Sequence, residues 1–481
     1  MDLAAFEHHL TSPQGRGSLP AGAPVADVDG GACCDRISFA VALDGGHVAA
    51  AGFEADGCGA AHAAASAAVT LVRRRTVIDA ARIGPAQIAA ELGGLSPGKL
   101  HAAELASDAL ARALGAAVRG APTPVASAPA RGRTLVAMSG GVDSTVAALL
   151  CAQERDVVAV TLELWSDTEY DAERSCCSAS AVAQARALAH RLGLPHFTLD
   201  LRPEFRAGVV DPFIAAYAAG ETPNPCTRCN GHVRLDAMLE FAERLGCAEL
   251  ATGHYARTAE ADDERGPLLR QAADAAKDQT YMLAALSPAS LARMSFPLGA
   301  LTKPQVRELA AAARLPVASK PDSQDLCFLA GTDRGRFLAR HGGVPASDGE
   351  IVDQDGTVLG RHRGQQLFTI GQRRGLGVAR GEPLYVLDKH AVSNRVVIGP
   401  RAALATTRVA VRGTRLHRPA ERVDRVKLRY RSAPLHARAT DGAGDGRLML
   451  ELTEPVAGAA PGQLACLMDG ELVVGWGTIS R

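Results

Sequence analysis

A strand, a glycine turn and a helix follow one another without interruption in the second quarter of the chain. The apolar run RTLVAM (133–138) precedes the turn SGGVDS (139–144), and the helical run STVAALLCAQ (144–153) follows it. A second apolar run, DVVAVTLEL (156–164), and a second helical run, AVAQARALAHRLG (181–193), continue the alternation. Strands that alternate with helices predict a parallel sheet covered by helices, so this part of the chain is expected to be an α/β domain.

The glycine turn is suited to holding phosphate. Backbone N–H groups at the start of a helix lack partners within the helix, and the helix dipole favours an anion there. Gly140 and Gly141 permit close backbone approach, and the hydroxyls of Ser139 and Ser144 can donate to phosphate oxygens. Asp143 would repel phosphate unless a cation intervenes, so we expect it to bind Mg²⁺ or to organise the turn.

The turn contains no lysine, so the γ-phosphate transfer of a Walker A loop is not expected. The six residues SGGVDS resemble instead the pyrophosphate loop of the ATP pyrophosphatases. That resemblance implies cleavage between the α- and β-phosphates of ATP and adenylation of a carbonyl oxygen.

Length and composition indicate a globular protein with several domains. Of its 481 residues 47% are hydrophobic and 22% charged, and a chain of this length predicts about two to four domains. No run approaches the roughly 18 apolar residues of a membrane-spanning helix, and no secretory signal is present, so a cytoplasmic protein without membrane contact is expected. The segment 120–133 is rich in Pro, Ala and Gly and reads as a linker. From about residue 350, short β-type segments between turn residues predict small barrel-like β-domains.

Charge is balanced overall but uneven along the chain. The 52 basic and 52 acidic residues cancel, so net charge predicts no partner. Residues 401–431 nevertheless hold nine arginines and one lysine against Glu421 and Asp424. This basic stretch could follow a phosphate backbone or could be a solvated arginine-rich face, and the sequence alone favours neither.

Eleven cysteines in a chain expected to be cytoplasmic favour metal or thiol chemistry over a disulfide framework. Cys226 and Cys229 form a CxxC in TPNPCTRCN (222–230), where two prolines predict a loop. A CxxC fits a redox pair, half of a zinc site or part of an iron–sulfur site, although no second CxxC follows at zinc-ribbon spacing. A third thiol, Cys327, lies in SKPDSQDLCF (319–328). Three further cysteines in apolar contexts are expected to be small buried hydrophobic residues: Cys151, Cys247 and Cys466.

Seven motifs, in this order, resemble those of the tRNA-specific 2-thiouridylase (MnmA) family: AMSGGVDS (137–144), TPNPCTRCN (222–230), ATGHYAR (251–257), KDQTYML (277–283), KPDSQDLCF (320–328), TIGQRRGLGV (369–378) and KLRYR (427–431). The resemblance covers about residues 132–481. It implies that ATP adenylates the C2 carbonyl oxygen of the wobble uridine of tRNA, and that sulfur then displaces AMP to give 2-thiouridine.

The resemblance also implies roles for single residues. In the family's usual scheme the cysteine matching Cys327 carries a persulfide, and the one matching Cys229 is the partner thiol in a transient disulfide. The positions implied to touch ATP are Ala137, Met138, Ser139, Gly140, Gly141, Val142, Asp143, Ser144, Leu162 and Gly253. Those implied to line the target base are Asn224, Pro225 and Cys226, and those implied to contact tRNA are Lys277, Asp278, Gln279, Arg429 and Tyr430.

Two of these positions, Arg429 and Tyr430, fall inside the basic stretch, which favours RNA binding there. Stacking of an extruded base is the expected use of Tyr430. Cys226 stands where some family members have an acidic residue, so three thiols are available. They leave open a second chemistry, a [4Fe–4S] cluster at Cys226, Cys229 and Cys327 whose fourth iron carries sulfide. No mechanism is assigned to Cys176 and Cys177.

Residues 1–120 resemble another family, the IscU/NifU N-terminal iron–sulfur scaffold. Its three ligand-bearing segments are matched by GACCD (31–35), DGCGAAHAAAS (56–66) and GKLHAAELASDAL (98–110). The implied ligands of zinc or an iron–sulfur cluster are Cys33, Asp35, Cys58 and His101. Ala102 stands where that family has a further cysteine, so a degenerate domain that only docks the sulfur donor is the alternative. Fusion of such a domain would tether the supply of sulfur or of a cluster to the thiolating enzyme that uses it.

The expected organisation is therefore a multidomain α/β chain. It comprises an α+β scaffold-like domain (1–119), a linker (120–132), a parallel-sheet ATP pyrophosphatase domain (133–340), a central β-rich domain (341–400) and a C-terminal barrel-like tRNA-binding domain (401–481). The expected partners are tRNA and a sulfur-donor protein, a cysteine desulfurase or a sulfur relay. Two alternatives remain open: another ATP pyrophosphatase, and a non-enzymatic iron–sulfur carrier.

Overall fold

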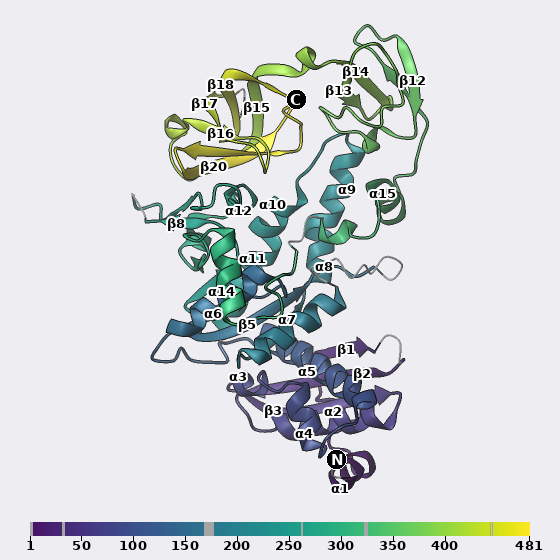
Figure 1. The fold of residues 1–481 in the computed structure, drawn as a ribbon, viewed down its shortest axis with the longest axis vertical. Helices are drawn as coiled ribbons and strands as arrows, with labels where there is room; N and C mark the ends of the chain where they lie inside the picture. Colours follow the sequence, from purple (N-terminus) through teal and green to yellow (C-terminus); the bar gives the residue numbers. More distant parts are fainter. Residues whose placement is uncertain are drawn as a thin grey trace.

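The computed structural model describes residues 3–30, 34–167, 178–260, 263–321, 326–442, 444 and 446–481. Figure 1 shows the N-terminal domain at one end of an elongated molecule, the α/β domain in the middle, and two β-domains at the other end. This arrangement confirms the expected multidomain α/β class.

The N-terminal domain packs helices on a three-stranded antiparallel sheet of order β1-β2-β3. Its elements are α1 (Leu3–Thr11), β1 (Val25–Asp29), β2 (Arg36–Asp44), β3 (His47–Asp56), α2 (Gly59–Val72), α3 (Val77–Ala80), α4 (Pro85–Glu91) and α5 (Leu100–Gly120). Helices α2 and α5 are rich in alanine and are buried along most of their lengths. A helix that is buried on more than one side needs neighbours on more than one face, and α5 finds the second of these outside its own domain.

The α/β domain is built on a five-stranded parallel sheet of order β10-β7-β4-β5-β6. The strands are β4 (Arg133–Ala137), β5 (Asp156–Glu163), β6 (His196–Asp200), β7 (Glu249–Thr252) and β10 (Met294–Ser295), and the helices beside them include α6 (Val142–Glu154), α7 (Ala179–Arg191) and α14 (Lys303–Ala312). The strands and helices expected between residues 133 and 193 are confirmed. Two hydrophobic clusters form, one on each face of the sheet.

Two long helices of this domain each contain a π-helical segment. One runs through α8 (Arg202–Phe205), η3 (Arg206–Val210) and α9 (Asp211–Ala218), and the other through α10 (Pro225–Cys229), η4 (Asn230–Arg234) and α11 (Leu235–Arg244). The remaining short elements are α12 (Thr280–Leu283), α13 (Pro288–Leu291), η5 (Cys327–Leu329) and α15 (Arg334–Gly342). π-Helical turns occur preferentially at functional sites, and the second one directly follows the CxxC.

The C-terminal domain is a closed six-stranded barrel, because β15 pairs with both β18 and β20. Its strands are β15 (Ala405–Leu416), β16 (Arg425–Lys427), β17 (Leu435–Asp441), β18 (Arg447–Ala457), β19 (Leu464–Asp469) and β20 (Leu472–Ile479). The central domain is a four-stranded sheet of β11 (Gly349–Val352), β12 (Val358–His362), β13 (Leu384–His390) and β14 (Arg395–Pro400). A hairpin of the α/β domain, β8 (Arg257–Ala259) and β9 (Leu268–Arg270), joins the barrel sheet beside β20, which the sequence did not predict.

Among the described residues, none of the helices combines the length and apolar character that a bilayer-spanning segment requires. Cys247 and Cys466 are buried, as predicted from their apolar contexts, and Cys151 is half-buried. Burial raises the pKa of the Cys247 and Cys466 thiols to about 12, which keeps them protonated and unreactive.

Candidate active site and metal-binding group

The glycine turn lies between β4 and α6 as the sequence predicted. Gly140 has φ +69°, a backbone conformation that favours glycine, and Gly141 is the N-cap of α6 without a side-chain cap. The hydroxyl of Ser144 accepts from the Ser139 N–H at 3.1 Å and donates to the Gly141 carbonyl at 3.3 Å. One of the two hydroxyls expected to face phosphate therefore also holds the turn in shape.

Gly253 directly follows β7, the strand beside β4, and its backbone lies against the glycine turn. A Cβ atom at this position would lie 2.6 Å from the Ser144 backbone N and 2.8 Å from the Asp143 carbonyl carbon. Since both atoms belong to the backbone, no side-chain rotation would relieve the overlap. The position requires glycine because two loops meet there.

Two lysines from distant segments supply the positive charge that the turn lacks. Lys303, the first residue of α14, places Nζ 2.8 Å from both carboxylate oxygens of Asp143. Lys320 donates to the Gly140 carbonyl at 3.1 Å and to Gln184 Oε1 at 2.5 Å. Neither of these two lysines is among the site residues predicted from the sequence. For Lys303 the sequence holds one local indication: the helix dipole disfavours a cation at a helix N-terminus, so a lysine at that position needs an anionic partner elsewhere in the fold.

The CxxC lies on a helix, so the prediction of a loop is wrong. Pro225 is at the first helical position of α10, where its fixed φ is favourable and its missing N–H costs nothing. The Asn224 side chain caps the helix by accepting from the Cys226 N–H at 3.1 Å. Cys226 is half-buried and Cys229 is buried, at 8% exposure.

Cys327 begins the turn η5 and is half-buried at the edge of the hydrophobic cluster that contains Cys229. The next residue, Phe328, packs its ring against Phe213 and Phe337, with centroids 5.0 and 5.2 Å apart. Phe328 is thus a buried anchor that fixes the position of Cys327 in the chain fold.

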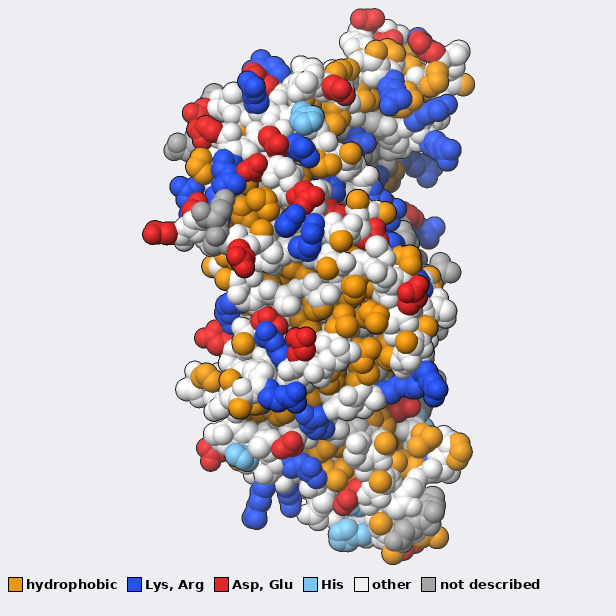
Figure 2. All heavy atoms as spheres, turned by 60° about the vertical axis from the view of Figure 1, so that its left-hand side comes forward, with side chains coloured by type: hydrophobic (Ala, Val, Ile, Leu, Met, Phe, Trp, Pro, Cys, Tyr) orange, Lys and Arg blue, Asp and Glu red, His pale blue; other side chains and the backbone are white. Residues whose placement is uncertain are grey.

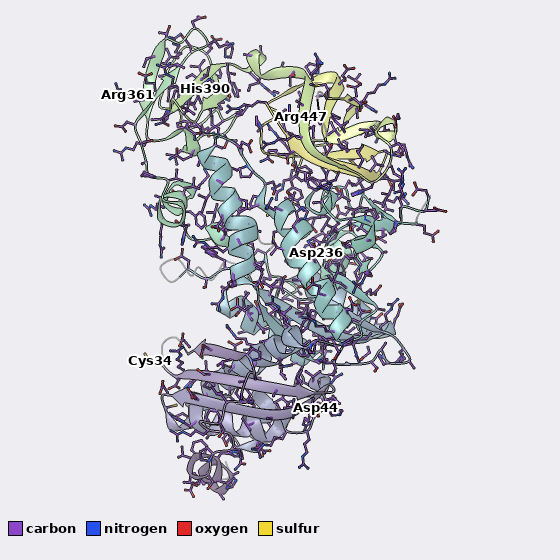
Figure 3. The ribbon with its side chains drawn as sticks, turned by 180° about the vertical axis from the view of Figure 1, so that it is seen from behind. Cys34, Asp44, Asp236, Arg361, His390 and Arg447 are labelled. Carbon is purple, nitrogen blue, oxygen red and sulfur yellow. The ribbon has the colours of Figure 1, made fainter. Side chains whose placement is uncertain are left out.

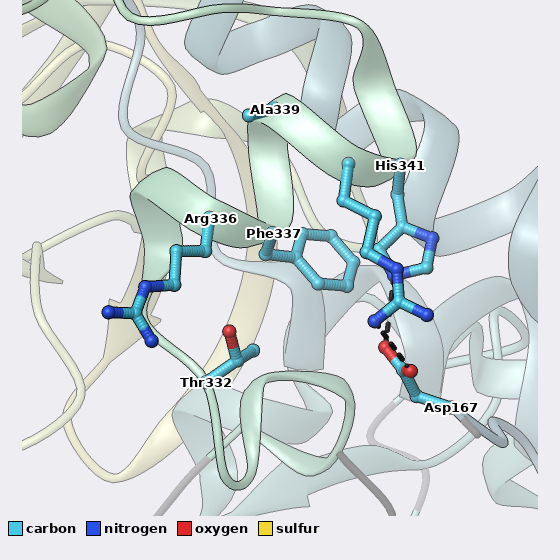
Figure 4. Close-up of a pocket in the computed structure, with 7 residues that line it drawn as sticks. Asp167, Thr332, Arg336, Phe337, Ala339 and His341 are labelled. Carbon is cyan, nitrogen blue, oxygen red and sulfur yellow. Dashed lines mark hydrogen bonds and ion pairs between the residues drawn. The ribbon is translucent and has the colours of Figure 1, made fainter. Parts of the chain in front are cut away.

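Behind this aromatic anchor lies a cavity of about 430 Å³ between the carboxyl end of β5 and α15. Its lining residues are Asp167, Thr332, Arg336, Phe337, Ala339, Arg340 and His341 (Figure 4). Asp167 pairs with Arg340 at 2.9 Å and accepts from His341 Nε2 at 3.1 Å. These contacts hold α15 against the segment that follows β5.

The residues expected to contact tRNA range from buried to exposed. Asp278 is only 6% exposed, and its carboxylate accepts from Lys427 Nζ at 3.1 Å and from the Thr280 hydroxyl at 2.8 Å. Lys277 and Gln279, on either side of it, are half-buried. The buried Asp278–Lys427 pair therefore holds this segment against the C-terminal barrel.

Tyr430 lies among several of the predicted site residues. Its pKa is raised chiefly by burial, and the neighbouring Asp278 and Cys226 raise it further. Arg431 and Lys277 act on the same pKa in the opposite direction, and the Arg431 guanidinium lies 5.9 Å from the ring centroid. The Tyr430 phenol is thus near enough to Lys277, Asp278 and Cys226 for their charges to act on its pKa, although these residues come from three separate motifs.

The basic stretch is partly neutralised within the fold. Among the described residues, these cations of the stretch form ion pairs with carboxylates: Arg412 with Glu221, Arg418 with Asp263, Arg422 with Asp469, Arg425 with Asp424, and Lys427 with Asp278. Figure 2 likewise shows Lys and Arg interspersed with Asp and Glu over one face of the molecule. Arg429 is exposed, and its guanidinium donates to the Gly458 carbonyl at 2.5 Å.

The N-terminal domain brings three of its four predicted ligands together, and Cys33 lies outside the described residues. Asp35, Cys58 and His101 offer donor atoms that all lie within 4.8 Å of one another. Asp35 Oδ2 is 3.2 Å from Cys58 Sγ and 3.4 Å from His101 Nε2. Nδ1 of His101 lies 3.1 Å from the Gly98 carbonyl, and this contact orients Nε2 toward Asp35 and Cys58.

Three residues adjacent in sequence to Asp35, Cys58 and His101 shape the surroundings of this group. Cys34, labelled in Figure 3 at the edge of the N-terminal domain, is exposed and has φ +54°. Ala102 is fully buried, so the position next to His101 points into the core. Gly57 has φ +133°, and a Cβ there would lie 2.1 Å from Asp35 Oδ1, so this residue must be glycine for the carboxylate to reach Cys58. Carboxylate, thiolate and imidazole are ligands that suit zinc or an iron–sulfur cluster.

Comparisons with known proteins find matching family models, curated relatives and solved structures. Family models match at residues 132–331 (tRNA methyl transferase HUP domain), 335–400 (tRNA methyl transferase PRC-barrel domain), 413–479 (Aminomethyltransferase beta-barrel domain) and 5–118 (NifU-like N terminal domain). The bifunctional protein NifU/MnmA of Rubrobacter xylanophilus is 42% identical over 98% of this chain and 97% of its own length. The tRNA-specific 2-thiouridylase MnmA of Chloroflexus aurantiacus is 44% identical over 72% of this chain and 98% of its own length. Among solved structures, the U34-tRNA thiolase NcsA of Methanococcus maripaludis matches 44% of this chain and 64% of its own, with 17% identity and a TM-score of 0.27.

These relatives define the class of the chain, an enzyme that transfers sulfur to tRNA. The chain belongs to the NifU/MnmA family, in which a NifU-like domain precedes a tRNA-specific 2-thiouridylase. The two resemblances seen in the sequence are therefore confirmed.

Proposed function

We propose that this enzyme adenylates the C2 carbonyl oxygen of the wobble uridine of tRNA with ATP and then replaces that oxygen with sulfur. The glycine turn receives the pyrophosphate end of ATP, and the segment around Tyr430, Lys277 and α10 receives the uridine. The remaining residues that we assign to ATP are Ala137, Met138, Val142, Leu162 and Gly253.

One hydrogen-bonded connection between the two parts carries this proposal. The Tyr255 hydroxyl donates to Asp143 Oδ1 at 2.9 Å, next to the glycine turn. The Tyr255 backbone N–H donates to Gln279 Oε1, and the Gln279 N–H donates to the Tyr255 carbonyl, both at 2.9 Å. Tyr255 therefore joins the nucleotide turn to the segment Lys277–Gln279, whose Asp278 is bound by Lys427, three positions before Tyr430.

In the first step the O2 atom attacks the α-phosphorus and pyrophosphate leaves. Lys303 and Lys320 stabilise the negative charge that develops on the departing group, together with the N–H groups at the start of α6. Asp143, bound to Lys303, is the residue that would ligate Mg²⁺, which would neutralise phosphate charge when bound.

In the second step the terminal sulfur of a persulfide on Cys327 attacks C2, and AMP leaves. The Cys229 thiolate then attacks Cys327 Sγ, which releases 2-thiouridine and leaves a Cys229–Cys327 disulfide for an external thiol reductant. The alternative chemistry uses Cys226, Cys229 and Cys327 as three ligands of an iron–sulfur cluster. The helical placement of Cys226 and Cys229 is compatible with either.

The decisive experiment combines product analysis with nucleotide analysis. Purified protein is incubated with ATP, a persulfide or sulfide source and unmodified tRNA, and nucleosides are identified by mass spectrometry. We expect 2-thiouridine together with tRNA-dependent release of AMP. AMP release that depends on a small molecule instead would support another ATP pyrophosphatase, and no AMP release would support an iron–sulfur carrier.

Replacement of Lys303 by methionine is expected to lower kcat/KM for ATP by about 100-fold, since a preorganised charge at a reacting oxyanion typically contributes that much. Lys303→Arg keeps the charge and should retain most of the activity. The measurement is tRNA-dependent AMP release as a function of ATP concentration. Unchanged ATP kinetics in Lys303→Met would remove this lysine from the nucleotide site.

We also propose that Asp35, Cys58 and His101, with Cys33, hold zinc or an iron–sulfur cluster. His101→Ala should lower metal affinity by about 10- to 100-fold or more, because it removes one of few ligands. Metal retained after dialysis is measured by elemental analysis, with His47→Ala, an exposed histidine of the same domain, as control. Equal metal content in both variants would contradict the assignment.

A further inference from the structure

Helix α5 lies between two sheets that belong to different domains. One side packs on strands β1 and β2 of the N-terminal sheet, and the other packs on β6 of the parallel sheet. A single hydrophobic cluster runs from Phe39 of β2 through Leu110 and Leu114 of α5 to Phe197 and Leu199 of β6. In a parallel α/β sheet, this face is ordinarily covered by a crossover helix of the same domain.

The helix approaches β6 very closely at one glycine. A Cβ atom on Gly115 would lie 2.2 Å from the Thr198 carbonyl oxygen, so no side chain fits between helix and strand there. Five residues further on, Gly120 has open space around it. Helix α5 and strand β6 are thus in close backbone contact at Gly115 and not along the whole helix.

A buried network of charges joins α5 to β5 beside this contact. The Arg112 guanidinium lies 2.6 Å from each carboxylate oxygen of Glu163, the last residue of β5, and 3.2 Å from Asp108. Asp108 also pairs with Arg186 of α7. All four side chains are largely shielded from solvent, between 5% and 16% exposed. An ion pair in such surroundings is costly to break, because one charge would remain buried without compensation.

The end of β5 is in turn bonded to the nucleotide turn. The Met138 N–H donates to the Val160 carbonyl at 2.8 Å, and the Thr161 hydroxyl donates to the Met138 carbonyl at 2.9 Å. Displacement of β5 would therefore move the start of the nucleotide turn.

We propose that α5 is a shared element that supplies the helical layer on one face of the ATP-binding sheet, and that Arg112 is a positioning residue that holds β5 in place for nucleotide binding. The second part rests on the proposed function, since it presumes ATP at the glycine turn. The N-terminal domain is then a fixed layer of the enzyme and not a module on a flexible tether.

The association of the two parts is tested without ATP or tRNA. A protease site is inserted in the full chain between Ala130 and Arg131, which are both exposed. After cleavage we expect the two fragments to elute as one particle in size-exclusion chromatography. Gly115→Leu should separate them, whereas Gly120→Leu should not, because only the first meets backbone. Separation of the cleaved wild-type chain would overturn the proposal.

The role of Arg112 is tested through the pH dependence of ATP binding. Burial raises the pKa of Glu163 to about 7, and Arg112 opposes that rise. Asp108 and Asp200 also raise this pKa, and Arg202 lowers it; Arg186 acts through its pair with Asp108. Without Arg112 the pKa of Glu163 rises further, so Glu163 is neutral near pH 7 and becomes an uncompensated buried anion as pH increases.

Arg112→Gln is therefore expected to raise the KM for ATP by about tenfold at about pH 8.5 and by less than about twofold at about pH 6.5, with little change in kcat. Arg112→Lys should restore most of the wild-type KM, and Arg36→Gln, an exposed arginine of the same domain, should have no effect. An equal defect at both pH values, or a loss in kcat alone, would overturn the positioning role. A wild-type enzyme without tRNA-dependent AMP release would instead refute the proposed function and leave the cleavage result standing.

Discussion

Replacement of Cys229 by serine is expected to lower tRNA thiolation by at least about 1000-fold while pyrophosphate release continues. A serine hydroxyl cannot attack a disulfide sulfur, so the second step stops, whereas adenylation uses no cysteine. The measurement is 2-thiouridine by mass spectrometry together with pyrophosphate in a single turnover. Loss of both signals would mean that Cys229 supports the fold or the nucleotide site instead.

The companion variants separate the two sulfur chemistries. Cys327→Ser should abolish thiolation as Cys229→Ser does, whichever of the two sulfur chemistries operates, because a persulfide carrier and a cluster ligand are equally indispensable. Cys226→Ser distinguishes them: activity that persists without iron indicates persulfide chemistry, and iron-dependent activity lost in all three variants indicates a cluster. Cys151→Ser, which changes a half-buried thiol of α6, should leave thiolation unchanged.

Replacement of Gly253 by alanine is expected to lower kcat/KM for ATP by about 100-fold, the typical consequence of displacing a reacting group by about 1 Å. The added Cβ would lie 2.6 Å from the Ser144 backbone N, so the nucleotide turn and the loop after β7 must move apart. tRNA-dependent AMP release over a range of ATP concentrations measures the effect.

The matched control for this variant is Gly381→Ala, since Gly381 has open space and no positive φ. Its ATP kinetics should equal those of the wild type. Gly253→Ala with unchanged ATP kinetics would mean that the turn tolerates displacement and that nucleotide contacts lie elsewhere.

The sequence suggests a flexible connection between the N-terminal domain and the α/β domain, whereas the structure shows the two domains packed together. The segment between Gly120 and Arg133 reads as a flexible linker, which suggests that the N-terminal domain raises a local concentration of sulfur or cluster. In the structure α5 is packed between the two sheets, and even the linker is held, since the Val125 N–H donates to the Arg244 carbonyl at 2.8 Å. The group of Asp35, Cys58 and His101, our proposed metal site, is therefore expected to keep a fixed position relative to the parallel sheet.

The sequence alone determined the elements whose signals are local. The order of apolar run, glycine turn and helical run was sufficient for β4, the turn and α6, because backbone conformation and helix start depend on neighbouring residues. The sequence also predicted that Asp35, Cys58 and His101 form one group, because these residues match the ligand positions of the IscU/NifU scaffold family. The apolar contexts of Cys247 and Cys466 likewise predicted their burial.

Only the tertiary structure decided the features that depend on distant partners. Pro225 looked like a residue that excludes regular structure, yet as the first residue of α10, with the Asn224 cap before it, it starts the helix that carries the CxxC. Lys303 reaches Asp143 across 160 positions of sequence, and α5 finds its second neighbour in β6. Such contacts leave no trace in local periodicity, because a side chain's apolar or charged character shows that it needs a partner and not which strand or helix supplies it.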